Sequence, residues 1–172
     1  MGKDFKIMIG AVVFTFLLIV GGAALFSSKG DEANDVGGAS TEIEGLEINP
    51  ISYQLGDVPI NGGIVTKEYE IKNTTGQTLK LKKITTSCMC TQAKVVVGEE
   101  ETRFFGMEHG MDKNPTISFE INSQETGKVV VTFDPAAHGP EGVGPFERIV
   151  WLNFSDPAGV KELKFDGSVV NN

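Results

Sequence analysis

The stretch Phe146-Glu-Arg-Ile-Val-Trp-Leu-Asn-Phe154 decides the fold. Alternate residues of a strand face the same side. Ile149 and Trp151 would face one side of this strand, and the apolar residues that alternate with them would face the other. A strand that is apolar on both faces is typical of the interior of a sheet. We therefore expect this stretch to be a central strand, with Trp151 buried in the core.

Short β-type runs continue outward from this strand and are separated by turn residues. Pro50 interrupts the first run, which places that run at a sheet edge. The other runs alternate apolar and polar residues, and no soluble segment has helical periodicity. The runs cover residues 48–55, 65–71, 79–90, 91–97, 117–121, 127–133 and 163–169. This spacing predicts one all-β domain over residues 46–172, an immunoglobulin-like antiparallel β-sandwich of seven to eight strands.

The N-terminal part of the chain predicts one transmembrane helix. Residues 7–26 carry no charge, and 20 helical residues span roughly 30 Å, the thickness of a bilayer's hydrocarbon core. Lys3 and Lys6 precede the segment and acidic residues follow it, so residues 1–6 are expected in the cytoplasm. The alternative is a signal peptide that is cleaved after the small residues 21–24. Both interpretations place the domain outside the cytoplasm, and a signal anchor makes the chain a single-pass membrane protein.

Composition limits the remaining classes of function. Residues 27–45 are rich in glycine, acidic residues and hydroxyls, which predicts a flexible linker. The whole chain has 172 residues and a net charge of −8. Such an acidic chain lacks the clustered lysine and arginine that nucleic-acid binding requires, so we expect no nucleic-acid partner. No catalytic motif is present, and we expect no enzymatic activity.

Several motifs resemble a bacterial family known as domain of unknown function 1573. They are Asn73-Thr-Thr-Gly76, Ser87-Cys-Met-Cys-Thr91, Val129-Val-Val-Thr-Phe-Asp-Pro135, Phe146-Glu-Arg148 and Leu163-Lys-Phe-Asp-Gly167. The likeness extends from Ile48 to Val169, although Met89 replaces the glycine of the family pattern and the insertion 98–115 is long. The resemblance implies an immunoglobulin-type sandwich, related in architecture to major sperm protein domains, that serves as an exported or anchored binding or scaffolding module.

Soft metal ligands gather in two short segments of the domain. Cys88 and Cys90 are two residues apart, and Met107, His109 and Met111 alternate within five residues. In extended backbone each set faces one side. Thiolate, thioether and imidazole are the donors that favour Cu(I), so these five residues form a candidate copper site. His138, in a glycine-rich loop, is a weaker candidate ligand.

The cysteines and the methionines also have structural interpretations. Cys88 and Cys90 can close a strand as small buried side chains, or form a disulfide in an oxidising compartment. Alternate positions on a strand are about 6.6 Å apart at Cα, so a disulfide here requires a turn or a bulge. Met107 and Met111 can pack beside Phe104 and Phe105 in a hairpin insertion.

The sequence as a whole favours a binding or scaffolding module over other classes of protein. Its expected partners are the membrane, through residues 7–26, and another envelope protein or a glycan, which loops or sheet edges would bind. No cofactor is expected in this interpretation. The alternative function is Cu(I) binding or delivery through the five residues of the candidate copper site.

Overall fold

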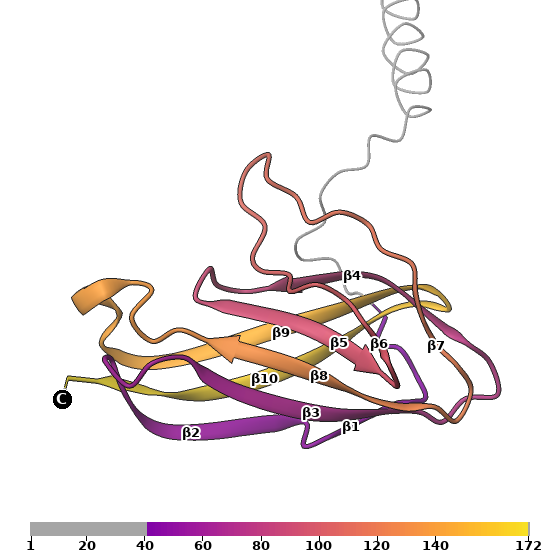
Figure 1. Ribbon diagram of the computed structural model, residues 1–172, viewed down its shortest axis with the longest axis horizontal. Coiled ribbons are helices and arrows are strands. Elements are labelled where there is room, and N and C mark those ends of the chain that lie inside the picture. Colours follow the sequence, from indigo (N-terminus) through magenta and orange to yellow (C-terminus); the bar gives the residue numbers. More distant parts are fainter. Residues whose placement is uncertain (1–40, 172) are drawn as a thin grey trace, which may run out of the picture. The chain divides into compact units, whose positions relative to one another are not determined.

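A computed structural model describes residues 41–171, and residues 1–40 and 172 lie outside this description. The described chain is an all-β sandwich of two five-stranded sheets (Figure 1). The predicted cytoplasmic segment 1–6, transmembrane helix 7–26 and most of the linker 27–45 fall on the residues that are not described. Within residues 41–171, no helix has the length and apolar character needed to cross a membrane.

The first sheet is antiparallel throughout and has the strand order β1-β3-β8-β5-β6. Its strands are β1 (Leu46–Asn49), β3 (Val65–Asn73), β8 (Thr126–Phe133), β5 (Thr91–Val97) and β6 (Glu100–Glu101). The alternation of valines that predicted a strand at 127–133 reappears as β8, which pairs on one side with β3 and on the other with β5. β8 is therefore the middle strand of this sheet.

The second sheet has the order β2-β10-β9-β4-β7. Its strands are β2 (Ser52–Pro59), β10 (Ala158–Val170), β9 (Gly144–Asp156), β4 (Leu79–Thr86) and β7 (Phe119–Ile121). β10 pairs in parallel with β2, whereas the other pairs are antiparallel. The prediction that the stretch 146–154 is a central strand is confirmed, because β9 lies in the middle of the sheet.

The sandwich has ten strands in the described residues, more than the seven to eight that the sequence predicts. One reason is that Pro50 does more than mark an edge strand. The chain leaves the first sheet after Asn49 and enters the second at Ser52, so the predicted strand 48–55 is divided between two sheets. The other reason is β6, a two-residue strand too short to show any periodicity.

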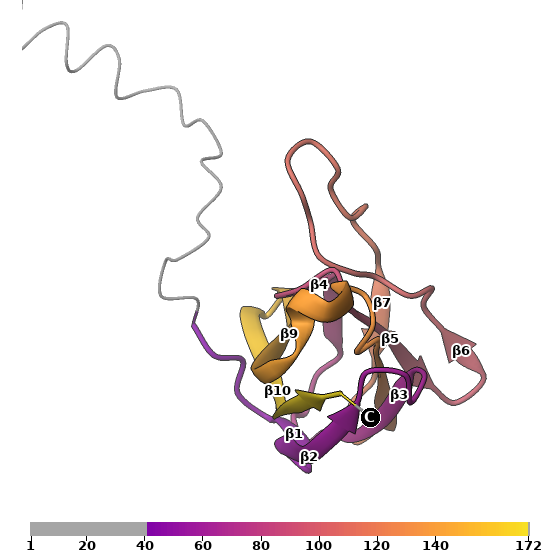
Figure 2. The ribbon, with the colours of Figure 1, turned by 90° about the vertical axis from the view of Figure 1, so that its left-hand side faces the viewer.

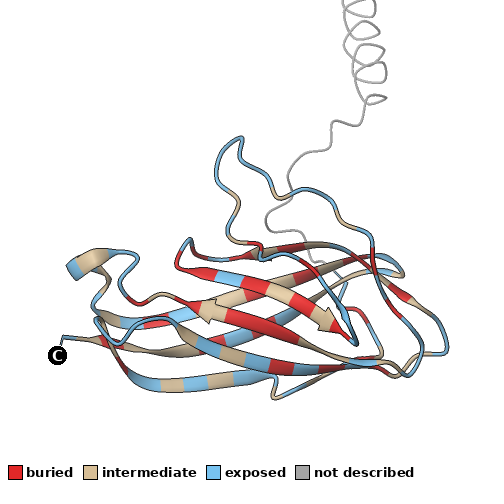
Figure 3. Cartoon of the chain, in the orientation of Figure 1, coloured by how far each residue is buried: buried red, intermediate tan, exposed pale blue. Residues whose placement is uncertain are grey.

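The core lies between the sheets and is formed by one face of the strands other than β6, whose two residues are exposed (Figure 3). The largest fully buried side chains include Tyr69 and Ile71 from β3, and Leu152 and Leu163 from β9 and β10. Three aromatic rings, those of Phe133, Phe146 and Phe165, pack against one another at the end of the core where β8 finishes and β9 begins.

The prediction that Trp151 is buried is wrong. Trp151 is half-buried, and its indole N–H donates a hydrogen bond to Glu162 Oε1 at 3.0 Å in an exposed position. Val150 and Leu152, its neighbours in β9, are fully buried. In a two-layer sandwich only one face of a strand points into the core, so apolar residues on both parities do not require burial on both faces.

The last residues of the predicted linker pack against the domain. The Ile43 side chain is buried, and its backbone N–H donates to the Val160 carbonyl at 3.1 Å. Val160 in turn donates to the Thr41 carbonyl at 3.0 Å. Residues 41–43 thus pair in parallel with the first residues of β10, and one apolar side chain and two backbone hydrogen bonds anchor them.

Candidate thiol site

The two cysteines lie in a tight turn that connects β4 of one sheet to β5 of the other. The hydroxyl of Thr86 donates to the carbonyls of Cys88 and Thr91, each at 3.0 Å. The N–H of Thr91 donates to the Cys88 carbonyl at 3.1 Å, and the N–H of Asp134 donates to the Cys90 carbonyl at 2.9 Å. The turn is therefore held by its own hydrogen bonds and by the end of β8, independently of the cysteine side chains.

Cys88 and Cys90 form a disulfide. Their Cα atoms are 5.2 Å apart, closer than the roughly 6.6 Å between alternate positions on a strand. The turn brings them together, as the sequence requires for a bridge between residues two apart. The sequence left open whether the two cysteines are buried thiols, metal ligands or a disulfide, and in the structure they form a disulfide.

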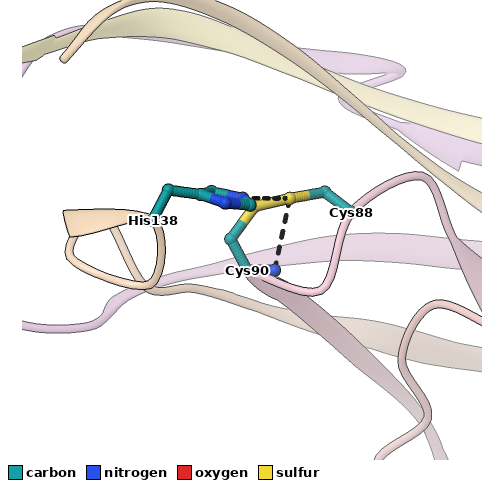
Figure 4. A group of neighbouring side chains, drawn as sticks. All are labelled: Cys88, Cys90 and His138. Carbon is teal, nitrogen blue, oxygen red and sulfur yellow. Dashed lines mark hydrogen bonds between the residues drawn. A yellow bond between two sulfur atoms is a disulfide. The ribbon is translucent and has the colours of Figure 1, made fainter. Parts of the chain in front are cut away.

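The His138 side chain points toward this disulfide (Figure 4). The residue precedes the short 3₁₀ helix η1 (Gly139–Gly142), in the connection between β8 and β9, and its Nε2 is 3.1 Å from Cys88 Sγ. Cys88, Cys90 and His138 form a group whose potential ligand atoms all lie within 4.8 Å of one another. His138 is the weakest candidate ligand by the sequence analysis, and it is the histidine that contacts a cysteine in the structure.

Arg148 places a cation beside the second sulfur. Its Nε–H donates to Cys90 Sγ at 3.2 Å, and its guanidinium lies 5.4 Å from the centre of the Phe146 ring. Burial lowers the pKa of Arg148 below its ordinary value. Cys88 Sγ accepts a hydrogen bond from the Cys90 backbone N–H at 3.2 Å. Each sulfur therefore faces a hydrogen-bond donor that would stabilise a thiolate.

The predicted ligands of the insertion are exposed, in contrast to the two buried cysteines. Met107, His109 and Met111 belong to the long connection between β6 and β7, which projects from the sandwich in Figures 1 and 2. Met111 is fully exposed and so contacts neither of the buried cysteines, and Met107 and His109 are also exposed. The structure thus brings together Cys88, Cys90 and His138, and it does not bring His109 into their group.

The projecting connection is nevertheless anchored at its base. Lys83 forms an ion pair with Glu108 at 2.6 Å, and the Asn114 side-chain amide donates to the carbonyls of Ile84 and Gly106 at 3.0 and 2.8 Å. Burial raises the pKa of Glu108, but the hydrogen bonds from Lys83 and from the Asn114 backbone outweigh this and leave the pKa below its ordinary value. The connection is thus positioned by polar contacts with β4.

Arg148 is the site residue that sequence reasoning missed. The only signal was its place in the motif Phe146-Glu-Arg148, which the family resemblance rests on. It lies 58 positions from Cys90. No local pattern predicts such a contact, because it depends on β9 beginning beside the turn between β4 and β5.

Solved structures with a similar fold come from different sources. A protein of unknown function from Porphyromonas gingivalis W83 is 18% identical, with a TM-score of 0.51, and the match covers 80% of this chain and 51% of that chain. This chain thus spans about half the length of that protein. At this identity the likeness shows the fold alone.

Two further matches have lower TM-scores. The ASH/PapD-like domain 7 of human CEP192 is 18% identical with a TM-score of 0.42, and the match covers 84% of this chain and 96% of that domain. WR4, a Caenorhabditis elegans member of the MSP family, is 10% identical with a TM-score of 0.40, and the match covers 73% of this chain and 98% of that protein. No curated protein matches this chain significantly.

The family comparison agrees with the resemblance seen in the sequence motifs. Residues 46–102 match the family model described as "Protein of unknown function (DUF1573)". This segment extends from β1 through β6 and includes the turn with both cysteines. The likeness to DUF1573 is therefore confirmed for residues 46–102 of the predicted range from Ile48 to Val169.

Proposed function

We propose that this chain is a membrane-tethered, extracytoplasmic β-sandwich that binds another protein of the cell envelope and has no enzymatic activity. The apolar segment 7–26 and the lysines before it support the tether and its orientation. A rigid sandwich that carries a long loop is a common arrangement for recognition.

The projecting connection 102–118, which we call the β6–β7 loop, carries the proposal. It exposes Phe104, Met107 and Met111, whereas most large apolar residues of the domain are buried. Methionine side chains are unbranched and adapt to apolar protein surfaces. A polar glycan offers less apolar area to such side chains, so the loop favours a protein partner.

Site-specific crosslinking in intact cells tests this role. A photoreactive amino acid at Met111 is expected to give a discrete crosslinked product that protease treatment removes. The matched control is the same amino acid at Gly76, an exposed turn position with open space around it. Equal products at both positions, or none at 111, would contradict the binding loop, and a product sensitive to glycosidases would identify a glycan instead.

The tether is tested separately, by protease accessibility. Protease added to intact spheroplasts is expected to digest the domain while the chain's N-terminal segment stays with the membrane fraction. Protection of the domain until the membrane is opened would contradict the extracytoplasmic placement.

Cu(I) binding is a second candidate function, now with a different ligand set. The observation that favours it is the group of Cys88, Cys90 and His138 within 4.8 Å. Two thiolates and one imidazole suit Cu(I), provided that the disulfide is first reduced. Met107, His109 and Met111 are not required in this arrangement.

A competition titration of the reduced full chain against a chromophoric Cu(I) chelator tests the ligand set. Cys88→Ser with Cys90→Ser should abolish binding, and His138→Gln should weaken it by at least about tenfold, because even the outer-shell partner of a ligand contributes that much. The double variant Met107→Leu and Met111→Leu is the matched control and should bind as the wild type does. Loss of binding in that control would restore the ligand set with the methionines.

A further inference from the structure

We propose that the Cys88–Cys90 disulfide is an exchange site that accepts two electrons from the dithiol of a partner protein, with Cys88 as the attacked sulfur and Cys90 as the leaving sulfur. The inference goes beyond a binding role and requires no metal. The inference depends on the proposed extracytoplasmic placement in one respect only, namely the compartment in which the partner protein reduces the disulfide.

The polarity of the exchange follows from the groups around each sulfur. Arg148 Nε–H donates to Cys90 Sγ at 3.2 Å, and the Thr91 hydroxyl lies 3.6 Å from the same sulfur. A fixed cation and a hydroxyl stabilise the negative charge that develops on a leaving thiolate. Exchange is faster when the leaving thiolate is better stabilised, so the bond should break toward Cys90.

Access favours attack at the other sulfur. Cys88 is 8% exposed and Cys90 is 4% exposed. The group beside Cys88 Sγ is His138, which is exposed, whereas Cys90 Sγ lies beside the half-buried Arg148 and the buried Thr91. An incoming thiolate therefore reaches Cys88 Sγ through a small displacement of His138, whereas Cys90 is enclosed by Arg148 and Thr91.

The exchange proceeds in two displacement steps. A thiolate of the partner attacks Cys88 Sγ and forms a mixed disulfide, while the Cys88–Cys90 bond breaks and its electron pair goes to Cys90 Sγ beside Arg148. The partner's second thiolate then attacks its own sulfur in the mixed disulfide and releases Cys88 as a thiolate. Cys88 Sγ receives hydrogen bonds from the Cys90 N–H and, when the imidazole Nε2 is protonated, from His138.

The electrons and protons of the reaction balance between these two proteins alone. The partner loses two electrons and two protons and becomes a disulfide, and Cys88 and Cys90 gain them and become thiols. His138 is placed to pass a proton to Cys88, since its Nε2 is 3.1 Å from that sulfur.

The fold does not depend on the disulfide. The bridge closes a loop of only two residues' separation, and such short loops restrict the unfolded chain least. The turn is also held by Thr86, by Asp134, and by Ser87, whose N–H donates to the Ile149 carbonyl at 2.9 Å. Reduction is therefore expected to leave the sandwich intact, as a reversible exchange site requires.

The rate of reduction by dithiothreitol tests the proposal. Full-length protein in detergent, with a metal chelator present, is quenched in acid and alkylated at intervals, and the reduced fraction is read by mass. Arg148→Met should slow reduction by about tenfold, because the leaving thiolate loses its cation, and Arg148→Lys should restore part of the rate. Arg103→Met is the matched control, since Arg103 also stacks on a phenylalanine, Phe105, at 5.0 Å.

The position of attack is tested with reduced glutathione, a monothiol. After acid quenching and alkylation, fragment mass spectra should place the glutathionyl group on Cys88 rather than on Cys90. The tryptophan and tyrosine bands of the near-ultraviolet circular dichroism spectrum should stay unchanged on reduction.

Three outcomes would overturn the proposal. They are equal reduction rates in the wild type, Arg148→Met and Arg148→Lys, glutathione on Cys90, or reduction only when the fold is lost. None of them alters the crosslinking expected at Met111, so the exchange site and the binding loop can fail independently.

Discussion

Replacement of Asn73 by alanine is expected to lower the free energy of unfolding by about 3 kcal/mol, because it opens a buried hydrogen-bond network. The Asn73 side chain is fully buried at the end of β3. Its Nδ2 donates to the carbonyls of Gln77, Ile121 and Asn122 at 2.8, 2.9 and 3.0 Å. Its Oδ1 accepts from the backbone N–H and the hydroxyl of Thr75 at 2.9 and 2.6 Å. One amide thus joins β3 in the first sheet to the end of β7 in the second.

Denaturant unfolding followed by Trp151 fluorescence measures this effect. Asn122→Ala is the matched control, since the Asn122 side chain accepts only one exposed hydrogen bond, from Thr78 at 3.2 Å. Its expected cost is within about 0.5 kcal/mol. A loss below about 1 kcal/mol for Asn73→Ala would mean that water replaces the amide without penalty, contrary to a buried network.

Replacement of Tyr69 by alanine is expected to cost about 3–5 kcal/mol, the range for large aromatic side chains in a core. Tyr69 is fully buried in β3, and its ring meets the Tyr53 ring edge-on with centroids 4.9 Å apart. Its hydroxyl donates to the Lys164 carbonyl at 2.8 Å, across to β10 of the other sheet. Tyr69→Phe keeps the ring and loses only this hydrogen bond, so it should cost about 1 kcal/mol.

Ionisation of Tyr69 is expected to make the free energy of unfolding depend on pH in the alkaline range. Burial, with a smaller contribution from Tyr53, raises the pKa of Tyr69 above its ordinary value. A phenol whose pKa is higher in the folded state contributes stability that is complete below the unfolded pKa of about 10 and declines as pH rises above it. Unfolding midpoints at increasing pH should fall more steeply in the wild type than in Tyr69→Phe. Parallel curves would show that Tyr69 ionises without unfolding the core.

Much of the sandwich was predictable from local pattern. Alternation of apolar residues in 127–133 and 163–169 predicted β8 and most of β10, because each of these strands presents one face to the core. The side of β9 that faces the core, and hence the exposure of Trp151, was not predictable in this way. Its neighbours show the same apolar character on both faces, and only the pairing of the two sheets decides which face is inside.

The candidate site was predictable in part, for a similar reason. The spacing of Cys88 and Cys90 shows in the sequence that any bridge needs a turn, and the structure has that turn. His138 reaches the sulfurs from the connection between β8 and β9, and Arg148 reaches them from β9 itself. Contacts over such separations depend on the strand order, which no motif in the chain specifies.

The redox state of Cys88 and Cys90 in cells tests the central claim most directly. Cells that produce the full chain are quenched in acid, and the denatured protein is alkylated before and after reduction and then analysed by peptide mass. We expect no alkylation of Cys88 or Cys90 before reduction in most of the protein, one alkyl group on each afterwards, and a linked peptide that contains both. Two alkylated thiols without prior reduction in most of the protein would contradict the disulfide as the resting state of the site beside His138 and Arg148.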